Sequence, residues 1–524
     1  MYPKNDAIVE KAALIDGIWP LEGFVKQKNA MPSLKYGFIG LGQGGSKIVD
    51  AFAGIRSPKD GEPVYPCLIV NSNLGDMIPL KNIPKHLQLS LKGYEQGVGK
   101  NPEIGKQAFL DNGKEIFEKI AERMVGCQII FVVGSMGGGT ATGAINVLTD
   151  ALADYLGIPT ASFISLPVPH EVESLNAYNA ITELLPKLKD IRQDENGRIY
   201  RGLENISILD NQKIFQDHIE DPEFPELKLT WDFYSNYKVA SIVHEWNVLT
   251  SLESHISLDA ADLFNNILLT GGVLTYAKKK INLDETVSKD DLITQIIETY
   301  KGKNVLANGF DYQKDMMAMG LVVVMPKERT DMLNQDTLEL IRLRFKEELP
   351  NVSLYPGFVS HNSRRHAIVY TIASMAGLPE RAKNLRQEAE ELIRKREEKE
   401  RNASGFDMGG RLDVANRPAP RRVGSDNPFA TKPSSQTPQV TPTIQQQPKR
   451  RPEDALVCLP RSADVVLLRT KYVHRQSPET ETPSETAVAT CRQSGCCLTS
   501  REGSQPTLAF RDQGAAAHRL DIRS

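Results

Sequence analysis

The sequence predicts an α/β protein in which two successive α/β regions are joined by one long helix. From Leu34 to about Asn211, short apolar runs alternate with helical patterns, which is typical of a parallel sheet covered by helices on both faces. A long helical pattern follows from about Tyr234 to His255, and a second α/β region extends from Ser257 to about Gly377. These three observations set the predicted fold class.

Composition and charge restrict the possible functions. The chain has 524 residues, of which 40% are hydrophobic and 25% charged, and its formal net charge is -3. This length fits two or three domains, and the small net charge gives no global reason to expect nucleic-acid or membrane binding. No run approaches the roughly 18 apolar residues that a membrane span needs, so we expect no span. Residues 1–33 lack the apolar core of a secretory signal.

The cysteines favour a reducing compartment, so we expect a cytoplasmic protein. Cys67 and Cys127 lie in apolar, strand-like runs and are predicted to be buried thiols. The other four lie near the end of the chain, and their spacing matches no closed zinc set.

The first region contains five apolar runs that read as buried strands of the parallel sheet. In such sheets ligands bind at the carboxyl ends of the strands, so candidate binding residues are expected just after each run. The runs are Tyr36–Gly40, Pro66–Val70, Gln128–Val133, Thr160–Leu166 and Ile206–Leu209.

The central helical pattern has apolar residues on more than one side, among them Val239, Ile242 and Trp246. Such a helix is expected to be buried between two domains. The clearest strands of the second region are residues 321–325 and 367–372. A charged helix is then predicted from Pro379 to about Arg401, with an apolar stripe only in its first half.

After Asn402 the composition shifts to Pro, Gln, Ser, Thr and Arg, which predicts disorder. Eight basic and three acidic residues between Asn402 and Pro452 leave a local charge of +5. The tail is therefore opposite in sign to the whole chain.

Two glycine-rich segments carry the chemistry. Gly40–Lys47, with the sequence GLGQGGSK, lies between a predicted strand and a predicted helix, where glycine lets backbone N–H groups approach a phosphate. It fits G-x-G-x-x-G, a pattern equally consistent with a tight turn, and its Ser-Lys order excludes a Walker A loop. The next strand ends in Val70–Asn73 without the acidic residue that an NAD site needs.

The second segment, Gly134–Gly143, follows another apolar strand and opens another helix. Main-chain donors in such a loop can surround an anion, and Thr140 and Thr142 add hydroxyl groups. A flexible linker is a poor alternative, because linkers do not sit between a strand and a helix. Two such segments on neighbouring strands predict a bound polyphosphate.

The second segment resembles a known family signature. Gly137–Gly143 is similar to the GGGTGTG loop of the tubulin/FtsZ superfamily, with Ala141 in place of the middle glycine. Further resemblances follow in the family's order over roughly Lys35 to Gly377: the first phosphate loop at Gly40–Lys47, the Asn-Thr-Asp turn at Asn71–Asn73, the γ-phosphate loop at Gly97–Gly105, the ribose turn at Pro167–Glu171, the base-reading pair at Asp210–Asn211 and the acid loop at Ile256–Leu263.

The resemblance implies a tubulin/FtsZ-like fold, GTP with Mg²⁺ as ligands, no dedicated metal-ligand cluster, and a set of nucleotide-binding residues. These are Gly42, Gln43, Gly44, Gly45, Ser46, Lys47, Asn71, Asn73, Gly99, Gly137, Gly138, Gly139, Thr140, Ala141, Thr142, Gly143, Glu171, Asn211, Tyr237 and Ser241.

Some positions depart from the FtsZ pattern. Lys47 stands in place of an asparagine, Leu175 in place of an arginine, Ser241 in place of the aspartate that faces guanine, and Ser257 in place of the asparagine of the acid loop. Tyr237 stands where FtsZ has an aromatic residue that stacks on the base, so stacking is expected to carry more of the base recognition.

The resemblance makes Asp259 and Asp262 the catalytic acids. A helix of about 20 residues spans roughly 30 Å, so acids beyond the end of the central helix do not reach the nucleotide of their own subunit. They do reach that of the next subunit in a head-to-tail filament, which makes hydrolysis depend on assembly. The alternative is that either acid only caps the helix that follows.

The predicted domains are an N-terminal extension (1–33), a GTP-binding domain (34–233), the central helix (234–256), a C-terminal activation domain (257–377), a charged helix (378–402) and a disordered basic tail (403–524). The charged helix and the tail are similar to those of the TubZ group, whose filaments move plasmid or phage DNA through the adaptor TubR. The basic run suits an acidic adaptor surface or DNA phosphates directly, and a solvated spacer is the alternative. A division-ring GTPase like FtsZ is the second functional hypothesis, and a nucleotide-binding enzyme that does not polymerise is the third.

Overall fold

The computed structural model describes residues 21–402, apart from residues 221–229, 253–255, 257, 287, 333 and 362–365. The first 20 residues and the predicted disordered tail, 403–524, lie outside the described residues.

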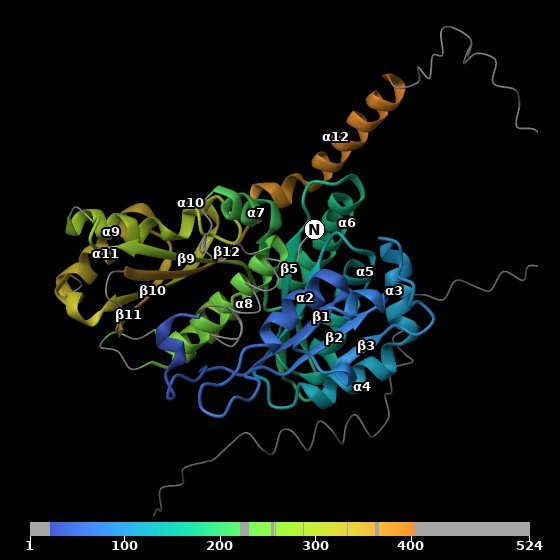
Figure 1. Cartoon of the computed structure of the whole chain (residues 1–524), viewed down its shortest axis with the longest axis horizontal. Coiled ribbons are helices and arrows are strands. Elements are labelled where there is room, and N and C mark those ends of the chain that lie inside the picture. Colours follow the sequence, from blue (N-terminus) through green and yellow to red (C-terminus); the bar gives the residue numbers. More distant parts are fainter. Residues whose placement is uncertain are drawn as a thin grey trace, which may run out of the picture. The chain divides into compact units, whose positions relative to one another are not determined.

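A ten-stranded sheet runs through the described chain in the order β11-β10-β12-β9-β8-β5-β4-β1-β2-β3 (Figure 1). The strands from β8 to β3 along this order pair in parallel, which confirms the predicted parallel sheet. Each of the five predicted strands lies within two residues of an observed one, and the short edge strand β3 was not predicted. The bounds are β1 (Tyr36–Leu41), β2 (Cys67–Asn71), β3 (Gln88–Ser90), β4 (Ile129–Ser135), β5 (Thr160–Leu166) and β8 (Asn205–Asp210).

The second α/β region adds its strands to the same sheet. Residues 205–207 of β8 pair in parallel with residues 272–274 of β9, so the two regions share one sheet. The antiparallel pairs β9–β12 and β12–β10 follow, and β11 pairs in parallel with β10. This continuity was not predicted. The strands are β9 (Gly272–Asn282), β10 (Met316–Pro326), β11 (Ser353–His361) and β12 (His366–Met375).

Helices cover both faces of the sheet, as predicted. Neighbouring residues of β1 show the two faces, because Phe38 and Ile39 are both fully buried but belong to different apolar clusters. On the Phe38 face lie α2 (Gly42–Ala53), α8 (Trp231–Leu249) and the segment around Phe24. On the Ile39 face lie α3 (Pro102–Asp111), α4 (Gly113–Arg123), α5 (Gly139–Ala151), α6 (Glu171–Leu184), α9 (Lys289–Ile297) and α11 (Gln335–Glu348). The remaining short helices are α7 (Asn211–Glu220) and α10 (Tyr312–Asp315).

The central helix is α8, and 14 of its 19 residues are buried. It begins three residues before the predicted start and ends at Leu249, six residues before the predicted end. The hydroxyl groups of Thr250 and Ser251 donate to the carbonyls of Asn247 and Val248. Such local bonds compete with the helical pattern, which gives a physical reason for the earlier end.

The charged helix is α12 (Glu380–Asn402). Ala382, Leu385 and Ala389 are buried, whereas most residues after Ile393 are exposed, so the apolar stripe occupies only the first half, as predicted. Figure 1 shows the second half extending away from the sheet. Among the described helices, none combines the length and the apolar character that crossing a bilayer requires.

Candidate functional site

Five predicted binding segments gather at one edge of the sheet. The strands β1, β2, β4, β5 and β8 are parallel neighbours and end at the same edge. The residues that follow them are Gly42, Ser72, Met136, Pro167 and Asn211. The structure therefore places the glycine-rich segments, the Asn71–Asn73 turn, the ribose turn and Asn211 side by side.

Each glycine-rich segment contains the first turn of a helix. This confirms the prediction that the second segment opens a helix, whereas in the first segment the helix begins within the segment and not after it. Helix α2 begins at Gly42, and α5 begins at Gly139 with Gly138 as its N-cap. The first N–H groups of a helix have no partner within the helix and carry partial positive charge. The two helix starts are close together, since a Cβ atom on Gly42 would lie 3.4 Å from the Ala141 nitrogen. Together they form an edge of the kind that favours anions, called the phosphate edge below.

Most glycines in these segments allow close backbone packing. A Cβ atom on Gly45 would lie 2.2 Å from the Val133 oxygen, and one on Gly143 would lie 2.2 Å from the Pro102 oxygen. Gly138 differs, because no described atom beyond its two chain neighbours lies within 4 Å of the Cβ position. Its lack of a side chain thus leaves open space at the start of α5, as a closely approaching ligand would need.

Two buried polar atoms at this edge fit a bound anion. Ser46 Oγ and Asn71 Nδ2 are buried and find no hydrogen-bond partner among the described residues. Such unpaired groups are costly and uncommon in native proteins. By contrast, Thr140 shares a 2.7 Å hydrogen bond with Ser72, and the Thr142 hydroxyl donates to the Gly138 carbonyl. The residues present therefore fit a phosphate-bearing ligand, with which the unpaired Ser46 and Asn71 atoms could bond.

The γ-phosphate loop packs against the start of α5. The side-chain amide of Asn176 donates to the carbonyls of Lys100 (2.9 Å) and Gly137 (3.3 Å). Lys100 also forms an ion pair with Glu173, 2.6 Å apart. Gly99 has a φ of 60°, which favours glycine. These contacts hold the predicted phosphate residues Gly99 and Gly137 in one cluster.

The predicted base-side residues lie around the start of α8. Tyr237 is half-buried and stacks on Phe233, with 4.2 Å between ring centroids. Its hydroxyl accepts a hydrogen bond from Asn82 Nδ2 at 3.2 Å. Burial, with the charge of Asp50, raises the pKa of Tyr237 to about 12. Ser241 is buried, and its hydroxyl donates to the carbonyl of Lys238.

We did not predict from the sequence that α12 contacts the predicted ribose turn. Arg396 forms an ion pair with Glu171, the predicted ribose contact. Arg381 binds both Asp210, which precedes Asn211, and the carbonyl of Pro167. The available signal was weak: Arg396 continues the heptad-like spacing of α12 where an apolar residue would be expected.

The predicted catalytic acids do not join this cluster. Lys47 in α2 forms an ion pair with Asp232 in the first turn of α8, so α8 begins beside the phosphate edge. Its 19 residues span about 28 Å. Asp259 and Asp262 follow its far end, which lies at the amino edge of the sheet because Asn247 bonds the backbone of Leu34 just before β1.

The acid loop is at the surface. Asp259 is exposed, and its carboxylate accepts a 2.8 Å hydrogen bond from the Asp262 nitrogen. Asp262 accepts from Asn266 at 2.9 Å, within the helical turn η7 (Asp262–Leu268). Asp259 is therefore a capping residue, as the alternative hypothesis held, and its second carboxylate oxygen stays available for another role.

A polar cavity of about 760 Å³ lies beside, but not within, the phosphate edge. It opens between α7, the start of α12 and residues 301–309, and its lining includes Asp210 and Arg381 together with Glu388. None of the predicted nucleotide-binding residues lines it. Among the described residues, no cluster of three or more His, Cys, Asp or Glu side chains is arranged to hold a metal ion.

Comparison with known families decides the identity of the fold. Residues 36–193 match the family described as "Tubulin/FtsZ family, GTPase domain". Residues 245–386 match "Tubulin/FtsZ-like protein TubZ-like, C-terminal domain". This chain belongs to the tubulin/FtsZ superfamily. Its C-terminal domain is most like that of the TubZ group.

Individual relatives agree with this likeness. It is 27% identical over 388 residues to the tubulin-like protein TubZ of Bacillus cereus, covering 70% of this chain and 84% of that protein. The FtsZ of Mycoplasmopsis pulmonis is 25% identical but covers 45% of this chain and 53% of that protein.

A solved structure shares the fold. The GTPγS-form protofilament of Bacillus thuringiensis serovar israelensis TubZ aligns with a TM-score of 0.62 and 22% identity, over 72% of this chain and 98% of that one.

Proposed function

We propose that this protein is a filament-forming GTPase that hydrolyses GTP at the contact between successive subunits and thereby segregates plasmid or phage DNA in the cytoplasm. The observation that carries the proposal is the separation of the phosphate edge from Asp259 and Asp262 by the length of α8. One subunit then holds the triphosphate, and the next subunit, stacked end on, supplies the acids.

Each part of the site has a chemical task in this proposal. The N–H groups at the starts of α2 and α5 bind the phosphates. The Ser46 hydroxyl and the Asn71 amide donate further hydrogen bonds to the phosphate oxygens at the same edge. Glu171 binds the ribose, while Asn211 and the Tyr237 ring hold the base. Asp259 and Asp262 orient and polarise the attacking water, which is the main protein contribution to phosphoryl transfer beyond charge stabilisation.

A magnesium ion bound with the triphosphate would offset the negative charge on its oxygens. Magnesium usually keeps several waters and few protein ligands, and the Ser46 hydroxyl, which has no partner among the described residues, would be available to it.

The DNA-segregation part rests on the relatives. The TubZ group supports it, and one structure with the same fold is that of a "type III plasmid segregation TubZ". The partner would be a DNA-binding adaptor of the TubR type, or DNA itself, bound by the basic residues after Asn402. An FtsZ-like division ring is less well supported, since the FtsZ match covers a smaller share of both proteins. The domain boundaries given above belong to the same proposal.

The test of assembly-dependent hydrolysis is GTP turnover per molecule as a function of protein concentration, with light scattering recorded on the same samples. Turnover should be near zero below the concentration at which scattering begins, and should rise steeply above it. Full turnover by dilute monomers would refute hydrolysis at subunit contacts.

A second experiment addresses DNA segregation. Full-length chain and a chain ending at Asn402 are incubated with adaptor-bound centromere DNA or with the DNA alone, and sedimented with GTP. Co-sedimentation of DNA with the full-length filaments only would support the tail as the attachment point. Equal sedimentation by both chains would assign the tail the role of a spacer.

A further inference from the structure

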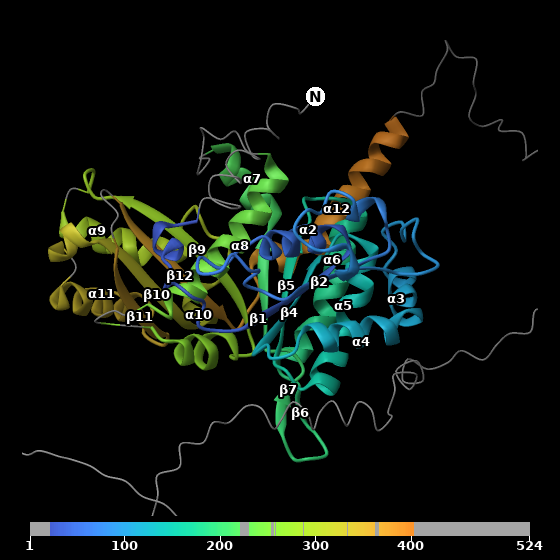
Figure 2. The ribbon, with the colours of Figure 1, turned by 60° about the horizontal axis from the view of Figure 1, so that its bottom comes forward.

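A small hairpin presents two isoleucines to solvent. Strands β6 (Ile191–Gln193) and β7 (Ile199–Arg201) pair in antiparallel fashion, with Gln193 opposite Ile199. Side chains at positions 191, 193 and 199 share one face of a two-stranded ribbon. Ile191 is 57% exposed and Ile199 is 70% exposed. Figure 2 shows the hairpin extending beyond the neighbouring strands.

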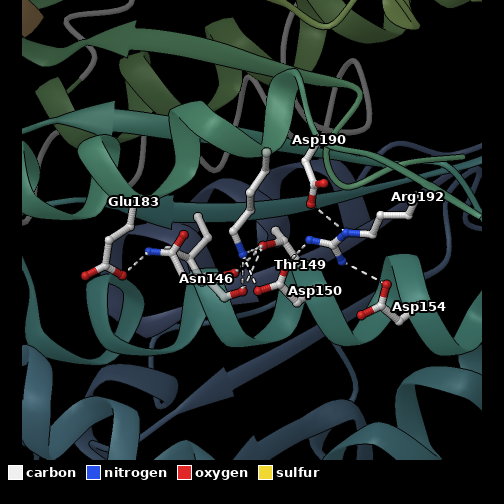
Figure 3. A network of polar contacts seen from close by, with 9 residues as sticks. Asn146, Thr149, Asp150, Asp154, Glu183, Asp190 and Arg192 are labelled. Carbon is white, nitrogen blue, oxygen red and sulfur yellow. Dashed lines mark hydrogen bonds and ion pairs between the residues drawn. The ribbon is translucent and has the colours of Figure 1, made fainter. Parts of the chain in front are cut away.

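The other face of the hairpin is fixed to α5 and its continuation. Arg192 donates to Asp150 at 2.9 Å, to Asp154 at 2.8 Å and to Asp190 at 2.6 Å (Figure 3). The hydroxyl of Tyr200 also donates to Asp154, at 2.9 Å. The polar face thus anchors the hairpin, which holds the isoleucines outward in a set position. Little further ordering is needed for them to meet a partner.

The hairpin lies at the amino edge of the sheet, opposite the phosphate edge. The nitrogen of Glu204, just after β7, donates to the oxygen of Thr160 at the start of β5. The oxygen of Glu204 accepts from the nitrogen of Gly271, just after η7 and before β9. The hairpin and the helical turn that carries Asp262 are therefore neighbours at the same end of the molecule.

A second apolar patch lies at the N-terminal end of α6, the helix that precedes the hairpin. Val168 is 51% exposed, Val172 46% and Leu175 38%. They occupy the ribose turn and the first turns of α6, beside the phosphate edge. Helix α6 then leads, through the short turn η5 (Leu185–Leu188), directly to the hairpin. One helix thus connects an apolar patch at the phosphate edge with an apolar hairpin at the opposite edge.

We propose that the hairpin isoleucines, Ile191 and Ile199, pack in the filament against Val168, Val172 and Leu175 of a second copy of this chain. This inference rests on the head-to-tail assembly proposed above. When subunits stack end on without a large rotation, the hairpin that follows the C-terminal end of α6 in one subunit meets the N-terminal end of α6 in the next. The contact removes both apolar patches from water. Val168 and Val172 flank Glu171 in the sequence, so the contact would also restrain the turn that carries Glu171. Filament assembly and the ribose contact of Glu171 would then be linked.

Cross-linking between two kinds of chain tests the geometry. One chain carries Ile199→Cys and the other Val172→Cys, each full length with the tail cysteines replaced by serine; Cys67 and Cys127 are buried. With GTP and a short bis-maleimide, the mixture should give a dimer that contains one of each chain. The control partner is Ile78→Cys, an exposed position after β2, three strands away from β5 along the same edge. Cross-links from Ile199→Cys to itself, or equally to Ile78→Cys, would overturn the proposed packing.

A double variant tests the energetic contribution. Ile191→Asp with Ile199→Asp should raise the critical concentration for GTP-induced scattering about tenfold or more, with unchanged GTP binding by the monomer. The matched control is Leu343→Asp, an exposed leucine on α11, which should assemble like the natural chain. If the natural chain itself does not assemble with GTP, the proposed function fails. If it assembles and the double variant does so at the same concentration, only this inference fails.

Discussion

Arg381 and Asp210 form an ion pair with 2.5 Å between Nη1 and Oδ1, and it joins the start of α12 to the end of β8. The same guanidinium group donates to the carbonyl of Pro167 at the end of β5, and Glu388, one of its other partners, accepts a 2.6 Å bond from Ser174 in α6. The helix that precedes the basic tail therefore contacts both turns predicted to hold the ribose and the base.

Replacing Arg381 should affect both stability and nucleotide binding. Arg381→Ala leaves the mostly buried carboxylate of Asp210 without its cation, with only the backbone nitrogens of Gln212 and Lys213 as donors among the described residues. We expect this to lower the free energy of unfolding by about 2 kcal/mol and to weaken GTP binding. Urea unfolding and titration with a fluorescent GTP analogue measure the two effects. Arg394→Ala, at an exposed position on the same helix, should change either quantity very little. Unaltered GTP affinity in a folded Arg381→Ala protein would contradict a link between α12 and the site.

Alanine substitutions at Gly139 and Gly138, in the second glycine-rich segment, should have different effects on stability and on GTP binding. A Cβ atom on Gly139 would lie 2.6 Å from the Asn101 nitrogen, so Gly139→Ala should lower the free energy of unfolding by about 2 kcal/mol through overpacking. Gly138 has a φ of -85° and open space around it. Gly138→Ala should therefore leave stability within about 1 kcal/mol but weaken GTP binding about tenfold, because the methyl group would occupy space near the phosphates.

Thermal unfolding without nucleotide and GTP titration distinguish these two outcomes. Should Gly138→Ala bind GTP as tightly as the natural chain, the start of α5 is not a phosphate contact.

The apolar pattern predicted much of this fold, because strands buried on both faces and helix-capping glycines leave strong local signals. The five strands of the first region, the central helix and the half-apolar α12 are all visible as patterns of single residues. The continuous sheet was not predictable from such patterns. Its two parts are joined by the pairing of Asn205 with Gly272, which lie 67 positions apart, and no local pattern indicates that these two strands are neighbours.

The candidate site was predictable where one segment carries it and not where partners are distant. The glycines and the Asn71 turn follow their strands directly. The pairing of Arg396 with Glu171 unites residues from two elements far apart in the chain, and nothing in the local sequence of either one indicates the other. The exposure of the hairpin isoleucines was likewise not predictable. Their apolar side chains predict burial, and only the structure shows that the opposite face of the hairpin is the one that contacts α5.

The acids should be separable into capping and catalytic contributions. Asp259→Asn keeps an oxygen that accepts from the Asp262 nitrogen, so the cap is preserved while the charge is lost. We expect normal GTP binding and filament formation, with GTP turnover at least about 100-fold slower. Asp259→Ala should show the same loss of turnover together with about 1 kcal/mol lower stability. If Asp259→Asn keeps natural turnover and only Asp259→Ala is impaired, the residue is a cap alone.

His244 should make stability depend on pH in mildly acidic solution. The ring is fully buried on α8, with Nδ1 2.9 Å from the Tyr65 hydroxyl, and burial lowers the pKa of His244 from 6.5 to about 3. Between these two values the unfolded chain binds a proton that the folded chain does not. The neutral ring therefore contributes fully above about pH 6.5, and its contribution declines as the pH falls toward 3. From pH 7.5 to 5.5 the loss of unfolding free energy amounts to about 1.4 kcal/mol.

Urea unfolding at both pH values measures this loss. The natural chain should lose about 1.4 kcal/mol more than His244→Gln between pH 7.5 and 5.5, whatever the variant's absolute stability. Parallel pH dependence in the two proteins would mean that His244 is protonated in the folded state.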